Sequence, residues 1–112
     1  MVLIVDDHEE VCRLVGIVLT AKGYQIEYAN NGLDALEKLR ARNGGFRAVI
    51  TDYEMPGMNG SELRDRILSE WPKMAVAIMS GQTALEGIPF LAKPFTPAEL
   101  YATLESVIST GV

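Results

Sequence analysis

The sequence predicts an α/β fold in which a parallel β-sheet is covered by helices on both faces. Short apolar runs rich in β-branched residues alternate along the chain with longer segments that repeat apolar residues at the helical spacing. Some of the runs are apolar at almost every position, which is typical of parallel strands buried on both faces. The chain of 112 residues is long enough for one core and too short for two ordinary domains. We therefore predict a single domain over residues 1–112 with a five-stranded parallel sheet.

The first half of the chain contains three predicted strands and two predicted helices. The first strand is an unbroken apolar run that leads into two aspartates, and the helix after it carries an apolar stripe. Glycine and Asn-Asn-Gly turns separate the elements that follow. The predicted elements are a strand at Val2–Val5, a helix at Glu9–Lys22, a strand at Gln25–Ala29, a helix at Leu33–Arg42 and a strand at Ala48–Thr51. The stripe of the first helix comprises Val11, Leu14, Val15, Val18 and Leu19.

The second half of the chain contains two more helices and two more strands. A Trp-Pro pair closes the first of these helices, because the residue before a proline disfavours helical geometry. The sequence Thr-Pro-Ala-Glu opens the last helix as a capping box, with proline at the first helical position. The predicted elements are a helix at Ser61–Glu70, a strand at Met74–Met79, a strand at Phe90–Ala92 and a helix that begins after Thr96.

Composition excludes several classes of protein. Ten basic and fifteen acidic residues give a formal charge of −5, which argues against direct binding of nucleic acid by this domain. The longest apolar run, Met74–Met79, is too short to cross a bilayer, and Met1–Val5 lacks the basic leader of a signal peptide. We therefore expect a cytoplasmic protein without a membrane segment. The single Cys12 cannot form an internal disulfide, and its position in the first helix indicates packing.

Carboxylates follow two of the predicted strands. Asp6 and Asp7 come directly after the first strand, and Asp52 follows the third strand, before a turn that contains Pro56 and Gly57. A single aspartate in such a position is most often a helix cap or a solvated loop residue. Three carboxylates at one edge of a sheet repel one another, and either a raised pKa or a bound cation relieves that repulsion.

The last two strands also end in polar residues. Ser80 follows the fourth strand, and Lys93 follows the fifth strand in the sequence Leu-Ala-Lys-Pro-Phe. Because ligands of open α/β sheets bind outside the carboxyl ends of the strands, we expect this hydroxyl and this ammonium to lie near the carboxylates.

These motifs, in this order, resemble the receiver domain of two-component response regulators, and the resemblance extends from Val2 to about Ser109. It implies a sheet order of 2-1-3-4-5, as in flavodoxin-like folds, and a cis peptide bond between Lys93 and Pro94. It identifies Asp52 as the phosphoacceptor, Ser80 as the hydroxyl that contacts the phosphoryl group, and Lys93 as its positive charge. The implied function is that of a phosphoacceptor signalling domain, which changes conformation on phosphorylation and is not an enzyme acting on other substrates.

The resemblance also implies a cofactor and partners. Mg²⁺ would be held by Asp7, Asp52 and the main-chain carbonyl of Glu54, with Asp6 acting mainly through a bound water. The phosphodonor would be a histidine kinase or a histidine phosphotransfer protein, and the downstream partner is a protein that the sequence does not identify. His8, which follows the acidic pair, is interpreted as a solvated residue that opens the first helix, because Mg²⁺ prefers oxygen ligands.

In this family the residues two positions after the phosphoacceptor and two after the hydroxyl tune the lifetime of the phosphoryl group. Here they are Glu54 and Gln82. The aromatic residue three positions before the lysine, Phe90, would act as a switch together with Ser80. The segment 80–89 is short and contains two glycines and a proline, so the usual fourth helix should be absent or vestigial.

Three alternative functions share part of this fold or of this set of residues. A haloacid-dehalogenase-like phosphatase also uses an aspartate nucleophile and Mg²⁺, but it requires a second aspartate where this chain has Glu54. A flavodoxin-like cofactor carrier requires a phosphate-binding loop rich in glycine or hydroxyl residues after Val5, and two aspartates stand there instead. A degenerate receiver that only binds a partner would lack some of the polar residues of the receiver motifs. All five are present here, namely Asp6, Asp7, Asp52, Ser80 and Lys93.

Overall fold

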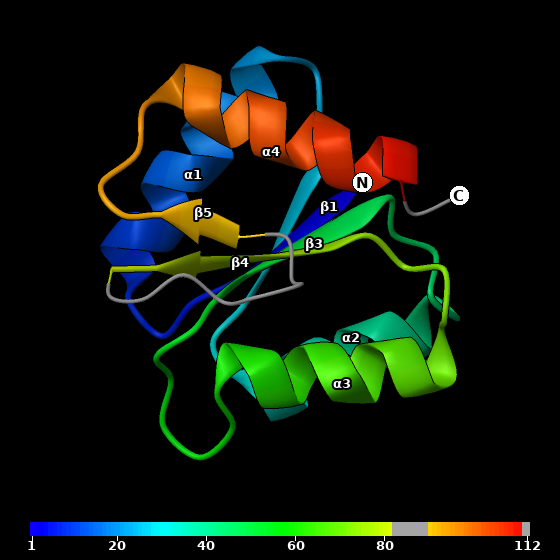
Figure 1. Ribbon diagram of the computed structural model, residues 1–112. Helices are drawn as coiled ribbons and strands as arrows, with labels where there is room; N and C mark the ends of the chain where they lie inside the picture. The colour runs from blue at the N-terminus through cyan, green and yellow to red at the C-terminus, as the bar shows by residue number, and fades with distance from the viewer. Residues whose placement is uncertain (82–89, 111–112) are drawn as a thin grey trace.

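The computed structural model describes residues 1–81 and 90–110, which form five strands and four helices (Figure 1). The elements are β1 (Val2–Val5), α1 (Glu9–Ala21), β2 (Ile26–Ala29), α2 (Gly32–Ala41), β3 (Ala48–Asp52), α3 (Gly60–Glu70), β4 (Val76–Ser80), β5 (Phe90–Ala92) and α4 (Pro97–Thr110). The absent fourth helix of the sequence analysis falls on residues 82–89, which lie outside the described residues. Within the described ranges, none of the helices is both long and apolar enough to cross a membrane.

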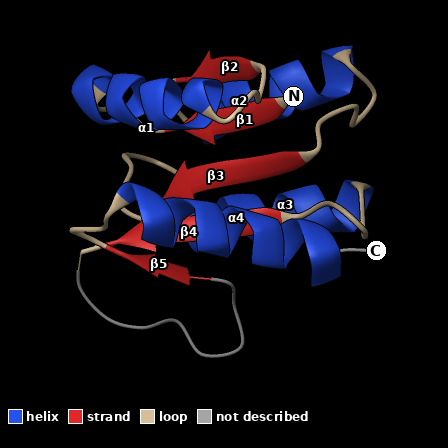
Figure 2. Cartoon of the chain, turned by 90° about the horizontal axis from the view of Figure 1, so that it is seen from above, coloured by secondary structure: helices blue, strands red, loops and turns tan. Residues whose placement is uncertain are grey.

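The five strands form one parallel sheet in the order β2-β1-β3-β4-β5, as the sequence predicted. Seen from above, β2 and β5 lie at opposite edges of this sheet (Figure 2). Strand β3 lies at the centre and pairs with β1 on one side and β4 on the other. Its five residues are all buried, which explains why its sequence is apolar on both faces up to Thr51.

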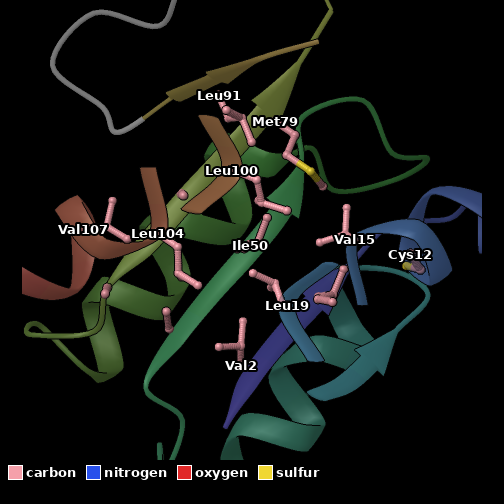
Figure 3. Close-up of a cluster of buried hydrophobic side chains, with 14 residues drawn as sticks. Val2, Cys12, Val15, Leu19, Ile50, Met79, Leu91, Leu100, Leu104 and Val107 are labelled. Carbon is pink, nitrogen blue, oxygen red and sulfur yellow. The ribbon is translucent and has the colours of Figure 1, made fainter. Parts of the chain in front are cut away.

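Helices cover the two faces of the sheet and make two separate cores. On one face α1 and α4 pack on the side chains of alternate strand residues, including Val2 and Ile50 (Figures 1 and 3). On the other face α2 and α3 pack on the intervening residues, such as Leu3 and Val49. Because successive side chains of a strand point to opposite faces, β1 and β3 contribute to both cores.

Side-chain caps fix the start of three helices next to the carboxyl edge of the sheet. The Asn31 side chain accepts a hydrogen bond from the backbone N–H of Asp34 at the start of α2, at 2.8 Å. Asn59 and Glu62 form a capping box at the start of α3. The predicted capping box of the last helix is confirmed, since Thr96 and Glu99 exchange hydrogen bonds of 2.9 and 3.2 Å.

Two details of the sequence analysis are wrong. The helical spacing predicts Leu14 on the buried stripe of the first helix, but Leu14 is 65% exposed. At about 100° per residue, it lies about 120° away from the midpoint between the buried Val15 and Leu19, which is beyond the edge of the stripe. The fourth strand begins at Val76 instead of Met74 and continues to Ser80, because the segment after Trp71 first makes a turn.

Candidate functional site

The carboxylates of the first and third strands meet at one edge of the sheet. Parallel pairing places Val5 beside Thr51, so the residues that follow each of them, Asp6 and Asp52, are neighbours. Both residues are buried, with 1% and 4% of their surface exposed, whereas Asp7 is exposed. The structure therefore brings the three predicted acids together and gives them different solvent access.

The fourth and fifth strands bring the hydroxyl and the ammonium to the same edge. Ser80, which is buried, pairs with Ala92, and its carbonyl oxygen accepts a hydrogen bond of 2.8 Å from the backbone N–H of Lys93. The Nζ atom of Lys93 donates to Oδ1 of Asp52 at 2.8 Å and lies 4.0 Å from Oδ2 of Asp6. The peptide bond between Lys93 and Pro94 is cis, which confirms the prediction made from the family resemblance.

The carboxylate of Asp6 is buried close to that of Asp52. Burial raises its pKa, and the nearby charge of Asp52 raises it further, while a hydrogen bond from the backbone N–H of His8 and the charge of Lys93 act in the opposite direction. Oδ1 of Asp6 accepts that bond at 2.9 Å, but Oδ2 is buried without a hydrogen-bond partner in the part of the chain that the structure describes. A cation near Oδ2 would reduce the electrostatic cost of burying the Asp6 carboxylate.

The acidic edge has the donor set of a metal site. Asp6, Asp7, His8 and Asp52 each offer one ligand atom, and these atoms lie within 4.8 Å of one another. The carboxylate oxygens are the ligands that Mg²⁺ prefers, and Oδ2 of Asp6 is buried without a hydrogen-bond donor among the described residues. The residues present therefore fit a divalent cation at this edge.

The loop after β3 folds back onto the end of its own strand. The backbone N–H of Gly60 donates to the carbonyl oxygen of Tyr53 at 2.8 Å. A Cβ atom on Gly60 would lie 2.6 Å from the carbonyl oxygen of Asp52, so only glycine allows this approach. Gly57 has a φ of 82°, which also favours glycine. Glu54, which lies in this loop between Asp52 and Gly57, is exposed.

His8 and Cys12 are the two residues near the site whose contacts the sequence analysis missed. The His8 ring is 67% exposed, as expected for a solvated residue, but its Nδ1 atom lies 3.2 Å from Oδ1 of Asp6 and 3.2 Å from Oδ1 of Asp7. The buried thiol of Cys12 donates to the carbonyl oxygen of Asp6 at 3.5 Å, and burial raises its pKa to about 11. The Asp-Asp-His sequence was the only available signal for the first contact.

The switch and tuning residues are described only in part. Phe90 is half-buried in β5, where it pairs with Ile78. Gln82 lies outside the described residues. Glu54 is exposed, and it stands two residues beyond Asp52, near the carboxylates.

An apolar groove adjoins the acidic edge between α1 and the start of α4. It has a volume of about 500 Å³. Leu14 and Val18 line it from α1, and Pro94, Phe95 and Pro97 line it from the segment after Lys93. Ile17, one turn from the groove on α1, is 62% exposed. The exposed Leu14 therefore belongs to an apolar surface next to Lys93.

The fold and this set of residues define a class of signalling domain, and the comparisons with known proteins agree. The family of the response regulator receiver domain matches residues 2–105 of the chain. The chain belongs to this family. This result confirms the resemblance seen in the sequence, and it favours the receiver over a phosphatase or a cofactor carrier.

Individual relatives show the same similarity. The chain is 36% identical over 121 residues to the chemotaxis protein CheY1 of Helicobacter pylori, and the match covers 97% of each protein. It is 33% identical to the CpxR homolog of Haemophilus influenzae, a transcriptional regulatory protein, of which it spans 49%. Among solved structures, the chemotaxis response regulator CheY4 of Vibrio cholerae has a TM-score of 0.82 and 32% identity, with 95% of this chain and 96% of that one covered.

Proposed function

We propose that the chain, as a single receiver domain over residues 1–112, accepts a phosphoryl group on Asp52 in a Mg²⁺-dependent reaction. The observation that carries this proposal is the position of the Asp52 carboxylate, which lies 2.8 Å from the Lys93 ammonium and close to the acidic pair at the end of β1. An anionic donor can approach a carboxylate only if positive charge offsets the repulsion. Lys93 supplies part of that charge.

The proposed step is an in-line displacement at phosphorus. An oxygen of Asp52 attacks the phosphorus of a phosphohistidine, an O–P bond forms, and the P–N bond breaks with its electron pair left on the donor imidazole. The proposed nucleophile is a carboxylate oxygen, which needs no general base to activate it. Ser80, buried beside it, would donate its hydroxyl hydrogen to a phosphoryl oxygen, and Lys93 would neutralise another.

The cation would be held by the acids of this edge. Asp7, Asp52 and the main-chain carbonyl of Glu54 are the proposed direct ligands, and Asp6 would act through a water. Bound Mg²⁺ would supply charge neutralisation for the phosphoryl oxygens. The chain would promote only its own phosphorylation and dephosphorylation.

The phosphorylated state would differ at the ends of β4 and β5. Ser80 would move toward the phosphoryl group, and Phe90, now half-buried, would turn inward to fill the space. Glu54 and Gln82 would set the lifetime of the phosphoryl group, because polar side chains at these positions leave room for the attacking water. Replacing both with bulky apolar residues should therefore change the rate of dephosphorylation.

The proposed donor is a histidine kinase or a histidine phosphotransfer protein in the cytoplasm, which would dock on the groove beside Lys93. The exposed Leu14 and Ile17 give α1 an apolar surface that a partner helix could cover. The groove begins next to the acidic edge, so a helix lying in it would bring a histidine close to Asp52. The signal would pass to a downstream partner protein.

The test of the acceptor uses acetyl phosphate as a small donor. The wild-type chain should gain one acid-stable, base-labile phosphoryl group in the presence of Mg²⁺ and none with chelator. Asp52→Asn should gain none. Asp65→Asn, which removes an exposed acid of α3, serves as the matched control. Labelling of Asp52→Asn to the wild-type extent would contradict the proposal.

The test of docking compares two donors. Leu14→Asp and Ile17→Asp should slow transfer from a cognate phosphohistidine protein about tenfold or more, since each places a charge in an apolar contact. Transfer from acetyl phosphate should not change. Leu33→Asp is the control, because Leu33 is also 65% exposed but lies on α2. An equally large loss of transfer rate in Leu33→Asp would contradict docking of the donor on the groove.

A further inference from the structure

We propose that His8 adds a nitrogen ligand to the cation site at the acidic edge, so that this receiver binds borderline transition ions such as Zn²⁺ through an imidazole that Mg²⁺ does not use. The proposal rests on the cation site of the proposed function and extends it to the choice of metal. His8 is not one of the oxygen ligands proposed for Mg²⁺.

The distances around His8 suit coordination. Its Nδ1 atom lies 3.2 Å from one oxygen of Asp6 and 3.2 Å from one oxygen of Asp7, and all four potential donors, Asp52 included, lie within 4.8 Å of one another. Two ligands of a tetrahedral Zn²⁺ with bonds of about 2.0 Å are about 3.3 Å apart, and adjacent ligands of an octahedral ion with bonds of about 2.1 Å are about 3.0 Å apart. The Nδ1 atom therefore stands where a neighbouring ligand of the carboxylates would stand.

The backbone holds the imidazole in this position. His8 is the N-cap residue of α1, with φ −98° and ψ 107°, but its side chain makes no capping hydrogen bond. Its backbone N–H instead donates to Oδ1 of Asp6 at 2.9 Å, which ties the turn to the buried acid. The ring is thus aimed at the carboxylates and not at the open N–H groups of the helix.

A second observation points to a cation independently of His8. Oδ2 of Asp6 belongs to a residue with 1% exposure and has no hydrogen-bond partner among residues 1–81 and 90–110. Its nearest positive charge is the Lys93 ammonium, 4.0 Å away. This buried oxygen lacks a hydrogen-bond donor within those ranges, and a water bound to a cation held by Asp7 and His8 would supply one.

The chemistry of the donors sets the expected preference. Carboxylates serve Mg²⁺ and transition ions alike, whereas imidazole is a common ligand of Zn²⁺ and Ni²⁺ and a poor one for Mg²⁺. Loss of the imidazole should therefore weaken Zn²⁺ binding and leave Mg²⁺ binding undiminished. The competing interpretation is that Nδ1–H only donates hydrogen bonds to the two carboxylates, in which case no metal–nitrogen bond forms.

The experiment uses tag-free protein, because His8 is the sole histidine of the chain. Metal-free protein without a phosphodonor is titrated with Zn²⁺ and, separately, with Mg²⁺ by calorimetry, and the His8 ring nitrogens are followed by long-range ¹H–¹⁵N NMR. Zn²⁺ should move the Nδ1 resonance to a metal-bound position. His8→Ala should weaken Zn²⁺ binding about tenfold or more without weakening Mg²⁺ binding.

Controls separate the proposed site from other ligands. Cys12→Ala should retain the Zn²⁺ affinity of the wild type, which rules out the buried thiol, and Asp7→Asn should weaken both metals. A Zn²⁺ affinity unchanged in His8→Ala, or a shift confined to Nε2, would overturn the proposal. Failure of the wild type to be phosphorylated in Mg²⁺ would instead overturn the proposed function, and the NMR titration would still report on His8.

Discussion

The ammonium of Lys93 and the carboxylate of Asp52 form an ion pair of 2.8 Å across 41 residues of sequence. Lys93 directly follows β5 and Asp52 ends β3; these strands are not adjacent, and β4 lies between them. In the unphosphorylated state the Lys93 ammonium therefore donates a hydrogen bond to one carboxylate oxygen of Asp52. Its charge must be shared with the phosphoryl group once that group is attached.

Lys93→Ala should separate metal binding from the response to phosphate. Removal of the ammonium leaves the acidic ligands in place, so Mg²⁺ affinity should stay the same or rise, because a nearby positive charge is lost. The phosphorylation-dependent conformational change should be lost or strongly reduced. Calorimetry with Mg²⁺ and amide chemical shifts with and without beryllofluoride measure the two effects. A large fall in Mg²⁺ affinity would contradict this assignment of roles.

Asp6→Asn should stabilise the metal-free protein. Burial raises the pKa of Asp6 in the folded state, so at pH values above that pKa the ionised group favours the unfolded chain. Asparagine removes this cost and can still accept the hydrogen bond from the backbone of His8. Thermal unfolding at neutral pH with chelator should show a higher Tm for the variant. Saturating Mg²⁺ should stabilise the wild type more than the variant, which narrows the difference.

Gly60→Ala should destabilise the fold by about 1–3 kcal/mol, since the added Cβ would meet backbone atoms at 2.6 and 2.9 Å. Gly16→Ala is a matched control on α1. There the added Cβ would meet the hydroxyl end of Tyr28, a side chain that is 42% exposed and can move aside. Chemical denaturation measures both variants. An effect of Gly16→Ala as large as that of Gly60→Ala would show that side-chain crowding costs as much as backbone crowding here.

The ion pair between α2 and α3 predicts a pH dependence. Arg40 donates to both carboxylate oxygens of Glu70, at 3.2 and 2.8 Å, and these bonds lower the pKa of Glu70. A lowered folded-state pKa stabilises the fold above the unfolded pKa of about 4.3, and this contribution is lost as the pH falls through the folded-state value.

Glu70→Gln should therefore lower the stability at neutral pH, and the difference from the wild type should vanish in acid. The pair is exposed, so added salt should reduce the effect. Glu105→Gln, an exposed acid of α4, controls for the change in net charge. Unfolding curves over a pH series provide the measurement. A difference that persists in acid would mean that the variant acts through packing instead of charge.

The strand ends could be predicted from the sequence because parallel strands align their carboxyl ends. An apolar run precedes each of Asp6, Asp52 and Lys93. The polar residue that ends such a run locates the carboxyl end of the strand. The contacts between these side chains could not be predicted in the same way. Whether Lys93 reaches Asp52, and whether His8 turns toward the acids, depends on loop geometry and rotamers that apolar periodicity does not encode.

The exposure of Leu14 shows a second limit. An apolar stripe predicts which residues share a face of a helix, but the neighbouring helix decides how wide the buried face is. Between α1 and α4 the packing closes over Val15 and Leu19 and leaves Leu14 and Ile17 exposed. An apolar residue beyond the buried stripe is therefore visible only once the partner helix is placed.

Strand β3 contributes Ile50 to one core and Val49 to the other, and it ends at Asp52. The carboxylate proposed to react is thus anchored to both layers of helices at once. A displacement of Asp52 would disturb packing on both faces of the sheet, while β5, in which only Leu91 is fully buried, has fewer such constraints. Phosphorylation would leave its acceptor nearly stationary, and the surrounding residues would rearrange about it.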